Sequence, residues 1–542
     1  MTTSIRTRPA APNSECLMTR LGRIALLLVL IFAGRTSAAE TTQRLPNFVV
    51  ILADDLGYSD LGCYGSEIQT PHLDALAAGG LRLTNFYNTA RCWPSRAALL
   101  TGYYAQQVRR DGFPGVAGGG SKGTRPDWAP LLPVALKTQG YRSYHSGKWH
   151  VDNKPIAAGF DHSYWLEDAG RNFHPRVHSE DDQRLPPVKP DSGYYSTTHI
   201  TERAIAHLQD HARSHAEQPF FSYVAYIVPH FPLHAPAEDI AKYKETYRVG
   251  WDTIRANRWK KMQEIGLVAG EISAVEREVG PPYDFPEQVA KFGPSEVNRP
   301  IPWNDLTPAQ QEFQASKMAI HAAMVDRMDQ EIGRLLQQIR DMGQMDNTFV
   351  MFMSDNGCSA EMMVRDDGHD PAAAPGSAAT HLCLGPGWST VSNSPFRRHK
   401  TWVHEGGIAT PMIVHGPGVQ APGSVRHDPG HLIDVWPTLT KLAGVAGEPT
   451  TGPTRPGVAI PLGEAITVSE RELWWAHEGN RALRVGNWKI TALKESPWEL
   501  YDLSTDRAEQ HNLAEKNPEK LKELADRWEL RSREYQEHAK RP

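Results

Sequence analysis

The sequence predicts an α/β protein whose mixed, mostly parallel sheet is flanked by helices, followed by a smaller C-terminal α+β subdomain. Uninterrupted apolar runs of strand length recur along the chain, as in strands that are buried on both faces of a parallel sheet. Segments with helical periodicity lie between these runs, which is typical of layered α/β folds. Beyond the Gly- and Pro-rich residues 446–457 the pattern changes to short strands and a charged terminal helix. We therefore expect a main domain over residues 40–445 and a subdomain over residues 446–542.

Four apolar runs are the predicted strands of the main sheet. They occupy residues 47–60, 219–230, 347–357 and 410–418. The first breaks into two acids and a glycine turn, the second ends in a histidine, and the third ends in Asp-Asn-Gly. Open α/β sheets bind ligands beyond the carboxyl ends of their strands, so these polar endings predict a site there. Taken singly, each acid is also a common turn or helix-cap residue.

Helical segments are predicted between the strands. Within residues 70–87 a helix starts near Pro71 and exits at a Gly-Gly pair, and longer helices cover residues 201–212 and 309–342. Another opens in the stretch "ARCWPSRAALLTG", because Pro94 suits a first helical turn and the alanines and leucines after it propagate the helix. Cys92 then lies at the helix N-terminus, where orphan N–H groups favour an anion. The alternative is a small, inert side chain tucked under the helix start.

Two long stretches show neither a strand nor a helix period. They are residues 112–123 and residues 370–388, both rich in Gly, Pro or Ala. Long irregular segments in compact domains are usually functional or disordered, so both are candidate rims of a substrate pocket. In the C-terminal part, the short strands "ELWWAHEG", "RALRVGNWKITAL" and "WELYDL" precede a helix over residues 518–537. The apolar stripe of that helix is most simply core packing.

The N-terminal 39 residues are predicted to be a signal peptide. Basic residues precede the apolar run 24–33, which is followed by small residues of an A-x-A-like cleavage site. The run is short for a bilayer span, so we expect a secreted or periplasmic protein with no stable membrane span after cleavage. Cleavage would remove five arginines and one glutamate, so the formal charge would fall from −5 to −9. That balance gives no basic footprint for nucleic acid.

Few cysteines are present for an exported chain of this size. Loss of Cys16 with the signal peptide leaves four, which are Cys63, Cys92, Cys358 and Cys383. A secreted chain of this size with four cysteines is not a disulfide scaffold. Whether Cys358 and Cys383 pair is left open by the sequence.

Acidic and cationic residues lie close to the predicted strand ends. Asp54 and Asp55 follow one strand, and Asp355 and Asn356 follow another. A dense group of carboxylates needs a cation, and oxygen-bearing side chains suit a hard ion, Ca²⁺ with Mg²⁺ as the alternative. An oxyanion substrate would need a ring of cations, and three short stretches supply candidates: Lys148 with His150, His230 with His234, and Lys400 with His404. Singly, each of these histidines is more often a satisfied structural residue.

The helix-opening stretch resembles the signature of type I sulfatases, C-x-P-S-R-x-x-x-L-T-G. Every fixed position is matched, by Cys92, Pro94, Ser95, Arg96, Leu100, Thr101 and Gly102. The stretches "ILADDLGYSDLGCYG", "GYRSYHSGKWH", "PHFPLHAP", "SDNG" and "KTWVHEGGIATP" resemble other blocks of that family and follow its order, and "WELYDLSTDRAEQHNLA" resembles its C-terminal subdomain. The resemblance covers essentially the whole mature chain and is highly specific.

This resemblance implies an alkaline-phosphatase-like fold and a sulfuric ester hydrolase acting on an aryl sulfate or a sulfated carbohydrate. It implies that a formylglycine-generating enzyme oxidises Cys92 to formylglycine (3-oxoalanine), whose hydrate is the nucleophile. Asp54, Asp55, Asp355 and Asn356 would bind Ca²⁺ together with residue 92, Asp355 also serving as a proton acceptor.

The remaining catalytic roles also follow from the resemblance. Arg96 and Lys148 would hold the hydrate and buffer its charge, and His150 would be the base that triggers sulfate release. His230 and Lys400 would bind the sulfate group and protonate the leaving oxygen. Lys148 is expected to bind substrate as well. His234 and His404 are not among the family's core residues and stay pocket or structural candidates.

Two other functions remain open from the sequence. One is a phosphonate or phosphodiester hydrolase of the same superfamily. The other is an inactive glycan-binding homologue, in which residue 92 would stay a thiol. The chain departs from many relatives at Ile408, where they carry arginine, and the substrate loops match no known pattern.

Overall fold

The computed structural model describes residues 44–365, 368–447, 451–463 and 471–542. Residues 45–542 form one compact unit, and the predicted signal peptide lies outside the described residues. Among the described residues, no helix combines the length and the apolar character that crossing a bilayer requires. The boundary expected between residues 445 and 446 stays a prediction.

The strands form two sheets. Their bounds are β1 Asn47–Asp54, β2 Leu81–Tyr87, β3 Arg142–Gly147, β4 His162–Leu166, β5 His178–Glu180, β6 Gln183–Arg184, β7 Phe220–Pro229, β8 Thr348–Ser354, β9 Ala409–His415, β10 Ser424–Arg426, β11 Gly430–His431, β12 Glu472–His477, β13 Asn480–Val485, β14 Trp488–Ala492 and β15 Glu499–Asp502. The helices are α1 Pro71–Gly79, α2 Cys92–Thr101, α3 Leu132–Lys137, α4 Ser196–Ser214, α5 Ala237–Tyr243, α6 Trp251–Glu264, α7 Pro286–Val289, α8 Pro308–Asp341, α9 Pro386–Ser392, α10 Glu405–Ile408, α11 Val435–Leu442 and α12 Pro518–Lys540.

The large sheet has the order β10-β2-β9-β8-β1-β7-β3-β4-β5-β6, and β11 also pairs with β2. The central strands β8, β1, β7, β3 and β4 are parallel to one another, whereas β9 runs antiparallel to both β8 and β2, and β5 runs antiparallel to β4. The mixed, mostly parallel sheet predicted from the sequence is therefore confirmed. Strands β2, β3 and β4 are not among the four predicted strands. For β2, the mixed pattern after the Gly-Gly exit of α1 gives a weak strand signal.

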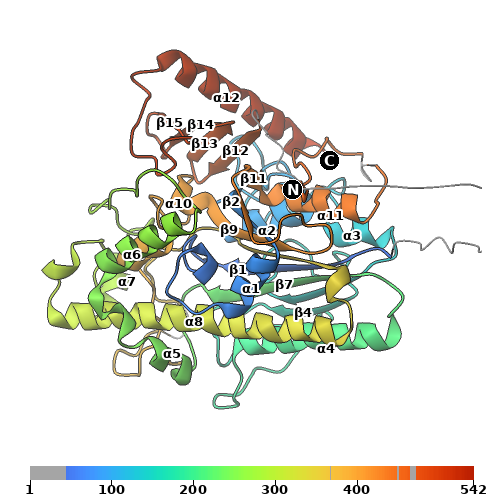
Figure 1. The fold of residues 1–542 in the computed structure, drawn as a ribbon, viewed down its shortest axis with the longest axis horizontal. Coiled ribbons are helices and arrows are strands. Elements are labelled where there is room, and N and C mark those ends of the chain that lie inside the picture. Colours follow the sequence, from blue (N-terminus) through green and yellow to red (C-terminus); the bar gives the residue numbers. More distant parts are fainter. Residues whose placement is uncertain (1–43, 366–367, 448–450, 464–470) are drawn as a thin grey trace, which may run out of the picture. The chain divides into compact units, whose positions relative to one another are not determined.

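Helices cover both faces of this sheet (Figure 1). Along β1, Val49 and Ile51 pack into a core that includes residues of α1, α4 and α8. Phe48, Val50 and Leu52 alternate with them and pack into a second core with residues of α2, α3 and α11. This alternation follows from the two-residue period of a strand. It explains why β1 is buried over its whole length.

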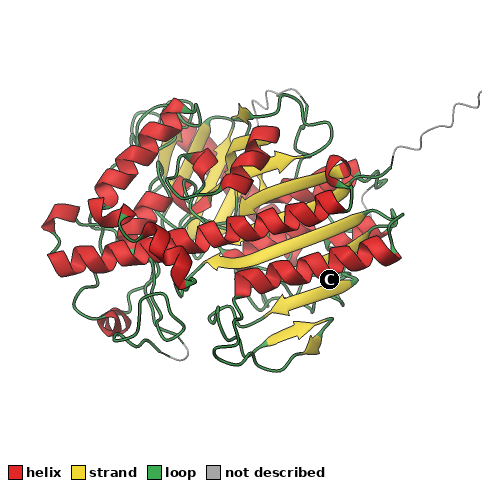
Figure 2. Ribbon diagram, turned by 60° about the horizontal axis from the view of Figure 1, so that its bottom comes forward, coloured by secondary structure: helices red, strands yellow, loops and turns green. Residues whose placement is uncertain are grey.

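The second sheet is antiparallel, in the order β12-β13-β14-β15. Helix α12 packs on it with Leu524 and Tyr535 buried, and Figure 1 shows this helix lying over the four strands. Viewed from another side, the strands of the large sheet run between layers of helices (Figure 2). The predicted mixture of short strands and a terminal helix is confirmed, although α12 extends to Lys540.

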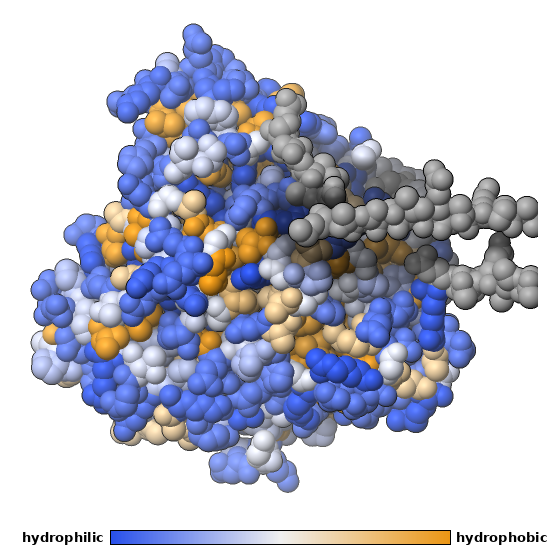
Figure 3. Space-filling view, viewed as in Figure 1, coloured by the Kyte–Doolittle hydropathy of each residue, from blue (hydrophilic) through white to orange (hydrophobic). Residues whose placement is uncertain are grey.

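The face seen in Figure 3 is mostly hydrophilic, with apolar residues in small groups. Among the described residues, the exposed large apolar side chains are Val134, Val249, Phe285, Val458 and Leu530. The structure also leaves the four described cysteines unpaired, including Cys358 and Cys383.

Candidate active site

The polar strand ends meet at one edge of the large sheet. Strand β1 pairs in parallel with both β7 and β8, so the carboxyl ends of the three strands lie side by side. Asp54 and Asp55 leave β1 there, His230 follows β7, and Asp355 and Asn356 follow β8. This topology brings the five residues to one edge of the sheet, where the sequence predicts a ligand site.

Helix α2 places Cys92 beside this edge. Arg91, at the N-cap, is extended, and the helix begins at Cys92, as the proline two residues later favours. Leu99 and Leu100 at the other end of α2 pack into the core and fix the helix against the sheet. Gly102 ends it in a left-handed conformation with φ +73°. Cys92 is 4% exposed and lies at the helix terminus where N–H groups lack intrahelical partners.

Three buried carboxylates each carry a cationic partner. Lys148 Nζ donates to Asp54 Oδ2 at 2.5 Å, and Lys400 Nζ lies 2.7 Å from Asp55 Oδ1. The guanidinium of Arg96 donates twice to Asp355 Oδ2, at 2.8 and 3.0 Å. These contacts join residues that are 94 to 345 positions apart in the chain into one polar cluster.

Two oxygens of the cluster point to a cation. Asp54 Oδ1 and Asn356 Oδ1 are buried and have no hydrogen-bond partner among the described residues. Asn356 uses its Nδ2 to donate to Asp55 Oδ1 at 2.6 Å, which leaves its own oxygen available. Buried acceptors of this kind are costly unless they meet a donor or a metal ion. Carboxylate and amide oxygens are ligands of hard cations, so the residues present fit such an ion.

The electrostatics of the cluster agree with this assignment. Burial opposes ionisation of Asp54, but Lys148, His230 and Arg96 outweigh it and lower the pKa of that carboxyl. Burial and the charge of Asp54 raise the pKa of Asp355. Two close carboxylates therefore compete for charge, and a bound cation would stabilise both in the ionised form.

A cavity of about 800 Å³ opens above the cluster. Cys92, Lys148, His150, His230 and Lys400 all line it, so the structure brings these predicted residues together. Arg96 does not line the cavity; it is completely buried and donates to the Lys148 carbonyl at 3.0 Å. Arg96 therefore positions both Asp355 and Lys148 from below.

Among the three histidines that line the cavity, His150 and His230 are the two with predicted catalytic roles, and burial of the ring lowers the pKa of both. Burial, reinforced by Lys148 and Arg96, holds the pKa of His150 well below its usual range. Burial lowers the pKa of His230 to about 4. His150 has φ +57°, so it does not continue the extended segment that the sequence analysis assumed for Lys148 and His150. Both still reach the cavity, because the chain turns after β3.

Glu361 and Arg91 are members of the site that the sequence analysis missed. Glu361 Oε1 lies 3.0 Å from the guanidinium of Arg91, and Oε2 lies 3.1 Å from Lys400 Nζ. Glu361 follows Asn356 in an irregular segment with no periodic pattern. Its neighbours in the sequence therefore give no indication that it belongs to the site. Arg91 directly precedes Cys92, and that position was the one available signal. Trp93 also lines the cavity, with its ring edge-on to His150.

His234 and His404 lie outside the cavity lining. His234 Nε2 is 2.6 Å from the Thr380 carbonyl, and His404 Nε2 is 3.3 Å from Glu499 Oε2. Both are buried, so their structural interpretation is the one that the contacts support. Of the two irregular stretches, residues 112–123 contribute Ser121 and Lys122 to the lining and residues 370–388 contribute His381. The second stretch also includes the start of α9.

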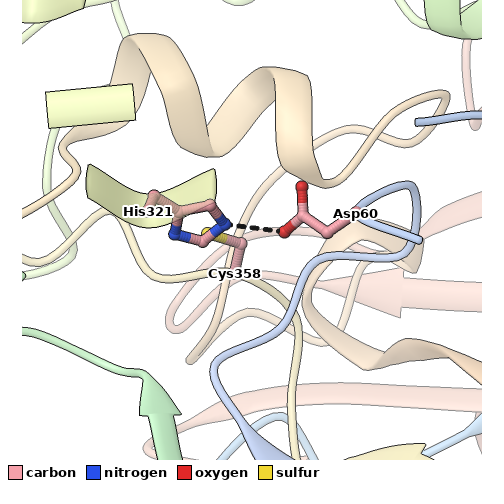
Figure 4. Close-up of side chains that lie close together, drawn as sticks. All are labelled: Asp60, His321 and Cys358. Carbon is pink, nitrogen blue, oxygen red and sulfur yellow. Dashed lines mark hydrogen bonds and ion pairs between the residues drawn. The ribbon is translucent and has the colours of Figure 1, made fainter. Parts of the chain in front are cut away.

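A second group of potential ligands lies deeper, formed by Asp60, His321 and Cys358 (Figure 4). His321 Nε2 lies 2.9 Å from Asp60 Oδ2, and Arg258 donates to the other oxygen at 2.7 Å. The backbone N–H of Gly57 also donates to Asp60 at 3.0 Å. The carboxylate is thus fully partnered, and the group ties the segment after β1 to α8 and α6.

Comparison with known proteins agrees with the geometry. Residues 46–445 match the family model described as Sulfatase. The chain is 34% identical to an uncharacterized sulfatase of Schizosaccharomyces pombe over 90% of this chain and 94% of that protein. It is 29% identical to the arylsulfatase of Klebsiella aerogenes over 78% of this chain and 91% of that enzyme.

The fold also matches a solved structure. The crystal structure of Ps i-CgsB in complex with k-i-k-neocarrahexaose superimposes with a TM-score of 0.63 and 23% identity, over 90% of this chain and 93% of that one. This likeness supports the alkaline-phosphatase-like arrangement of a mostly parallel sheet between helices. Because the family model spans most of the chain and the relatives align over nearly their whole length, the protein belongs to the type I sulfatase family and is an enzyme that hydrolyses sulfate esters.

Proposed function

We propose that this sulfatase removes sulfate from an aryl sulfate or a sulfated carbohydrate through Cys92, oxidised to formylglycine, beside a Ca²⁺ ion. The observation that supports it most directly is the placement of Cys92 in the cavity, at a helix N-terminus next to the acidic cluster. The cavity of about 800 Å³ is large enough for a sugar ring. The solved structure with neocarrahexaose favours the carbohydrate class.

Asp54, Asp55, Asp355 and Asn356 would hold the Ca²⁺, which supplies Lewis-acid polarisation of a sulfate oxygen when bound. Oxygen donors with flexible carboxylate geometry suit Ca²⁺, with Mg²⁺ as the alternative. Maturation of Cys92 requires a formylglycine-generating enzyme as a partner. The hydrated aldehyde would supply one hydroxyl whose oxygen bonds to sulfur while the S–O bond to the substrate alcohol breaks. Deprotonation of its second hydroxyl would re-form the aldehyde and break the C–O bond to sulfate.

Lys148 and His150 are placed to act on the nucleophile. Lys148 Nζ is fixed by Asp54 and lines the cavity with its positive charge, so it can stabilise developing negative charge. The neutral ring of His150 can accept the proton whose removal releases sulfate. Its Nδ1 has no hydrogen-bond partner among the described residues.

His230 and Lys400 are placed to bind the sulfate group. Both line the cavity and both lie near Asp55, with His230 Nε2 at 3.7 Å and Lys400 at 2.7 Å. Asp55 and Glu361 raise the pKa of Lys400 above its usual value despite burial. Lys400 therefore supplies a fixed charge. Proton donation to the leaving oxygen by His230 needs the imidazolium form, which burial disfavours and a bound sulfate anion would favour.

The test is hydrolysis of p-nitrophenyl sulfate and of defined sulfated saccharides by protein made with a formylglycine-generating enzyme. Wild type should be active, Cys92→Ala should lose at least about 10³-fold in kcat, and mass spectrometry should find the aldehyde at residue 92. Full activity with an unmodified thiol would overturn the nucleophile assignment. Faster turnover of a phosphodiester than of every sulfate ester would favour the phosphodiesterase alternative.

Export to the periplasm or to the medium is part of this proposal and rests on residues outside the described structure. N-terminal sequencing of the exported protein should begin at Glu40. Retention of residues 1–39 in the mature protein would contradict it.

A further inference from the structure

The cavity offers more room than a sulfate group needs. Its volume is about 800 Å³, and the sulfate-binding residues Lys148, His230 and Lys400 form only part of its lining. The rest includes Ser121, Lys122 and Thr124, residues 165–170 at and after the end of β4, and Phe231 and Pro232. The side chains of these residues determine which other functional groups of the substrate the cavity can bind.

Two of the three acids of the lining are paired with arginines. Three carboxylates face the cavity, from Asp152, Glu167 and Asp168. Asp152 is paired with Arg125 at 2.7 Å. Asp168 is paired with Arg171 at 2.8 Å. Glu167 accepts a hydrogen bond from Ser179 at 3.1 Å.

Most of the cations of the lining are likewise occupied. Lys148 is paired with Asp54, Lys400 with Asp55, and Arg91 with Glu361. Arg110 donates to the backbone carbonyls of three residues that flank the cavity, which are Ser121, Gly123 and His150. These four cations are held by the protein itself.

Two cations remain, Arg365 and Lys122. Neither has a carboxylate within ion-pair distance among the described residues, and both are exposed and line the cavity. The guanidinium of Arg365 lies 4.7 Å from the ring centroid of Phe231, which is itself in the lining. A guanidinium stacked on an aromatic ring is oriented in advance, and its fork matches a carboxylate or sulfate.

We infer that Arg365 and Lys122 form a subsite for a second anionic group, so that the substrate is a sulfate ester of a saccharide bearing a further sulfate or carboxylate. This inference rests on the proposed function. The second anion would meet Arg365, which is stacked on Phe231 beside His230, and Lys122, which lines the cavity from another segment. Neither has a carboxylate partner among the described residues. The reaction at sulfur is unchanged, and the subsite selects which esters reach it.

The test compares specificity constants within a panel of substrates. The panel contains p-nitrophenyl sulfate, monosulfated monosaccharides, their disulfated positional isomers, and sulfated uronic acids. Wild type should show at least about tenfold higher kcat/KM on one or more doubly anionic saccharides than on the matching monosulfated ones, as expected for charge-assisted hydrogen bonds. Comparison of the disulfated and uronic arms identifies whether sulfate or carboxylate is preferred.

The double variant Arg365→Gln/Lys122→Gln should reduce that preference at least about tenfold, measured as the ratio of kcat/KM on the preferred substrate to kcat/KM on p-nitrophenyl sulfate. Lys441→Gln, at an exposed position on α11 outside the cavity, removes a charge without touching the lining and should keep the wild-type ratio. An unchanged ratio in the double variant, or a wild type with no preference across the panel, overturns the subsite. A wild type inactive on every sulfate ester overturns the proposed function instead.

Discussion

Glu361 connects two cations of the cavity wall. It is 1% exposed and contacts Arg91 through one oxygen and Lys400 through the other. Ser359 donates to it at 3.1 Å, and Arg91 also donates to Thr401. Arg91 and Lys400 carry like charges and repel each other. The carboxylate that they share offsets this repulsion and holds both side chains in place. Glu361 is therefore a positioning residue that acts through its neighbours.

We predict that Glu361→Gln lowers kcat/KM for a sulfate ester at least about tenfold, mainly by raising KM. Glutamine keeps the shape but removes the charge that holds Lys400 against the substrate. Steady-state kinetics and thermal unfolding should be measured together. The matched control is Glu296→Gln, which breaks a buried pair with Lys317 outside the cavity lining and should cost stability while KM stays the same. Equal KM values in the two variants would contradict the positioning role.

At the scale of elements, Asp60 joins three segments of the chain. It lies in the turn after β1 and contacts His321 of α8 and Arg258 of α6, and Arg258 also pairs with Glu67. Asp60, His321 and Arg258 are buried, and Figure 4 shows Asp60 with His321. The turn carries Asp54 and Asp55 at its start, so these contacts also fix the acidic edge of the sheet.

Asp60→Asn should destabilise the fold by about 3 kcal/mol or more, because it removes the buried carboxylate that pairs with Arg258 and contacts His321. Burial opposes ionisation of Asp60, but His321 and Arg258 outweigh it and hold the pKa of that carboxyl below its usual value. A depressed folded-state pKa gives stability that is present above the unfolded pKa of about 4 and is lost as pH falls below it.

The difference in free energy of unfolding between wild type and Asp60→Asn should therefore be largest near pH 7 and shrink below about pH 4. Urea unfolding at a series of pH values measures it. A difference that grows on acidification would show that the sign is wrong.

At the scale of the whole molecule, buried ion pairs connect the C-terminal sheet to the main domain. Lys489 of β14 lies 2.8 Å from Glu405 of α10 and 2.7 Å from Glu509, and all three are buried. The indole N–H of Trp475 donates to the Asn88 carbonyl beside α2. The apolar core of this part includes Ala98 of α2 itself.

Removal of residues 446–542 should therefore prevent stable folding of the remainder. It would leave Glu405 without Lys489 and expose the apolar surface of α2, losses that exceed the few kcal/mol by which domains are stable. The intact protein should unfold in one transition by calorimetry. A truncated protein that is soluble and melts like the full chain would contradict this and would support an independent domain ending at residue 445.

Binding of a cation at the acidic cluster should stabilise the whole fold. A ligand that binds only the native state adds about 2.7 kcal/mol when present at 100 times its Kd. We predict that chelation lowers the Tm of the purified protein and that Ca²⁺ restores it, with Mg²⁺ compared in a parallel titration. Asp355→Asn should abolish this response, because it removes a carboxylate from the cluster. A Tm that ignores both chelator and cation would refute the metal assignment.

Much of this molecule was determined by the sequence alone. The apolar runs identified β1, β7, β8 and β9, because a strand buried on both faces must be apolar throughout. The block around Cys92 and the acids at the strand ends identified the site, since their residue types and order are local and specific. Signals of this kind depend only on neighbours in the chain.

Only the tertiary structure decided which charges meet. Glu361 pairs with residues 270 positions before it and 39 after it, and no periodicity encodes such a distance. Arg365 and Lys122 have no carboxylate partner among the described residues. The sequence could not predict this, because it depends on where the fold places every acid around the cavity. Likewise, only the tertiary structure separates His230, which lines the cavity, from His234 and His404, which contact other parts of the protein. The three side chains are identical, and their surroundings in the fold distinguish them.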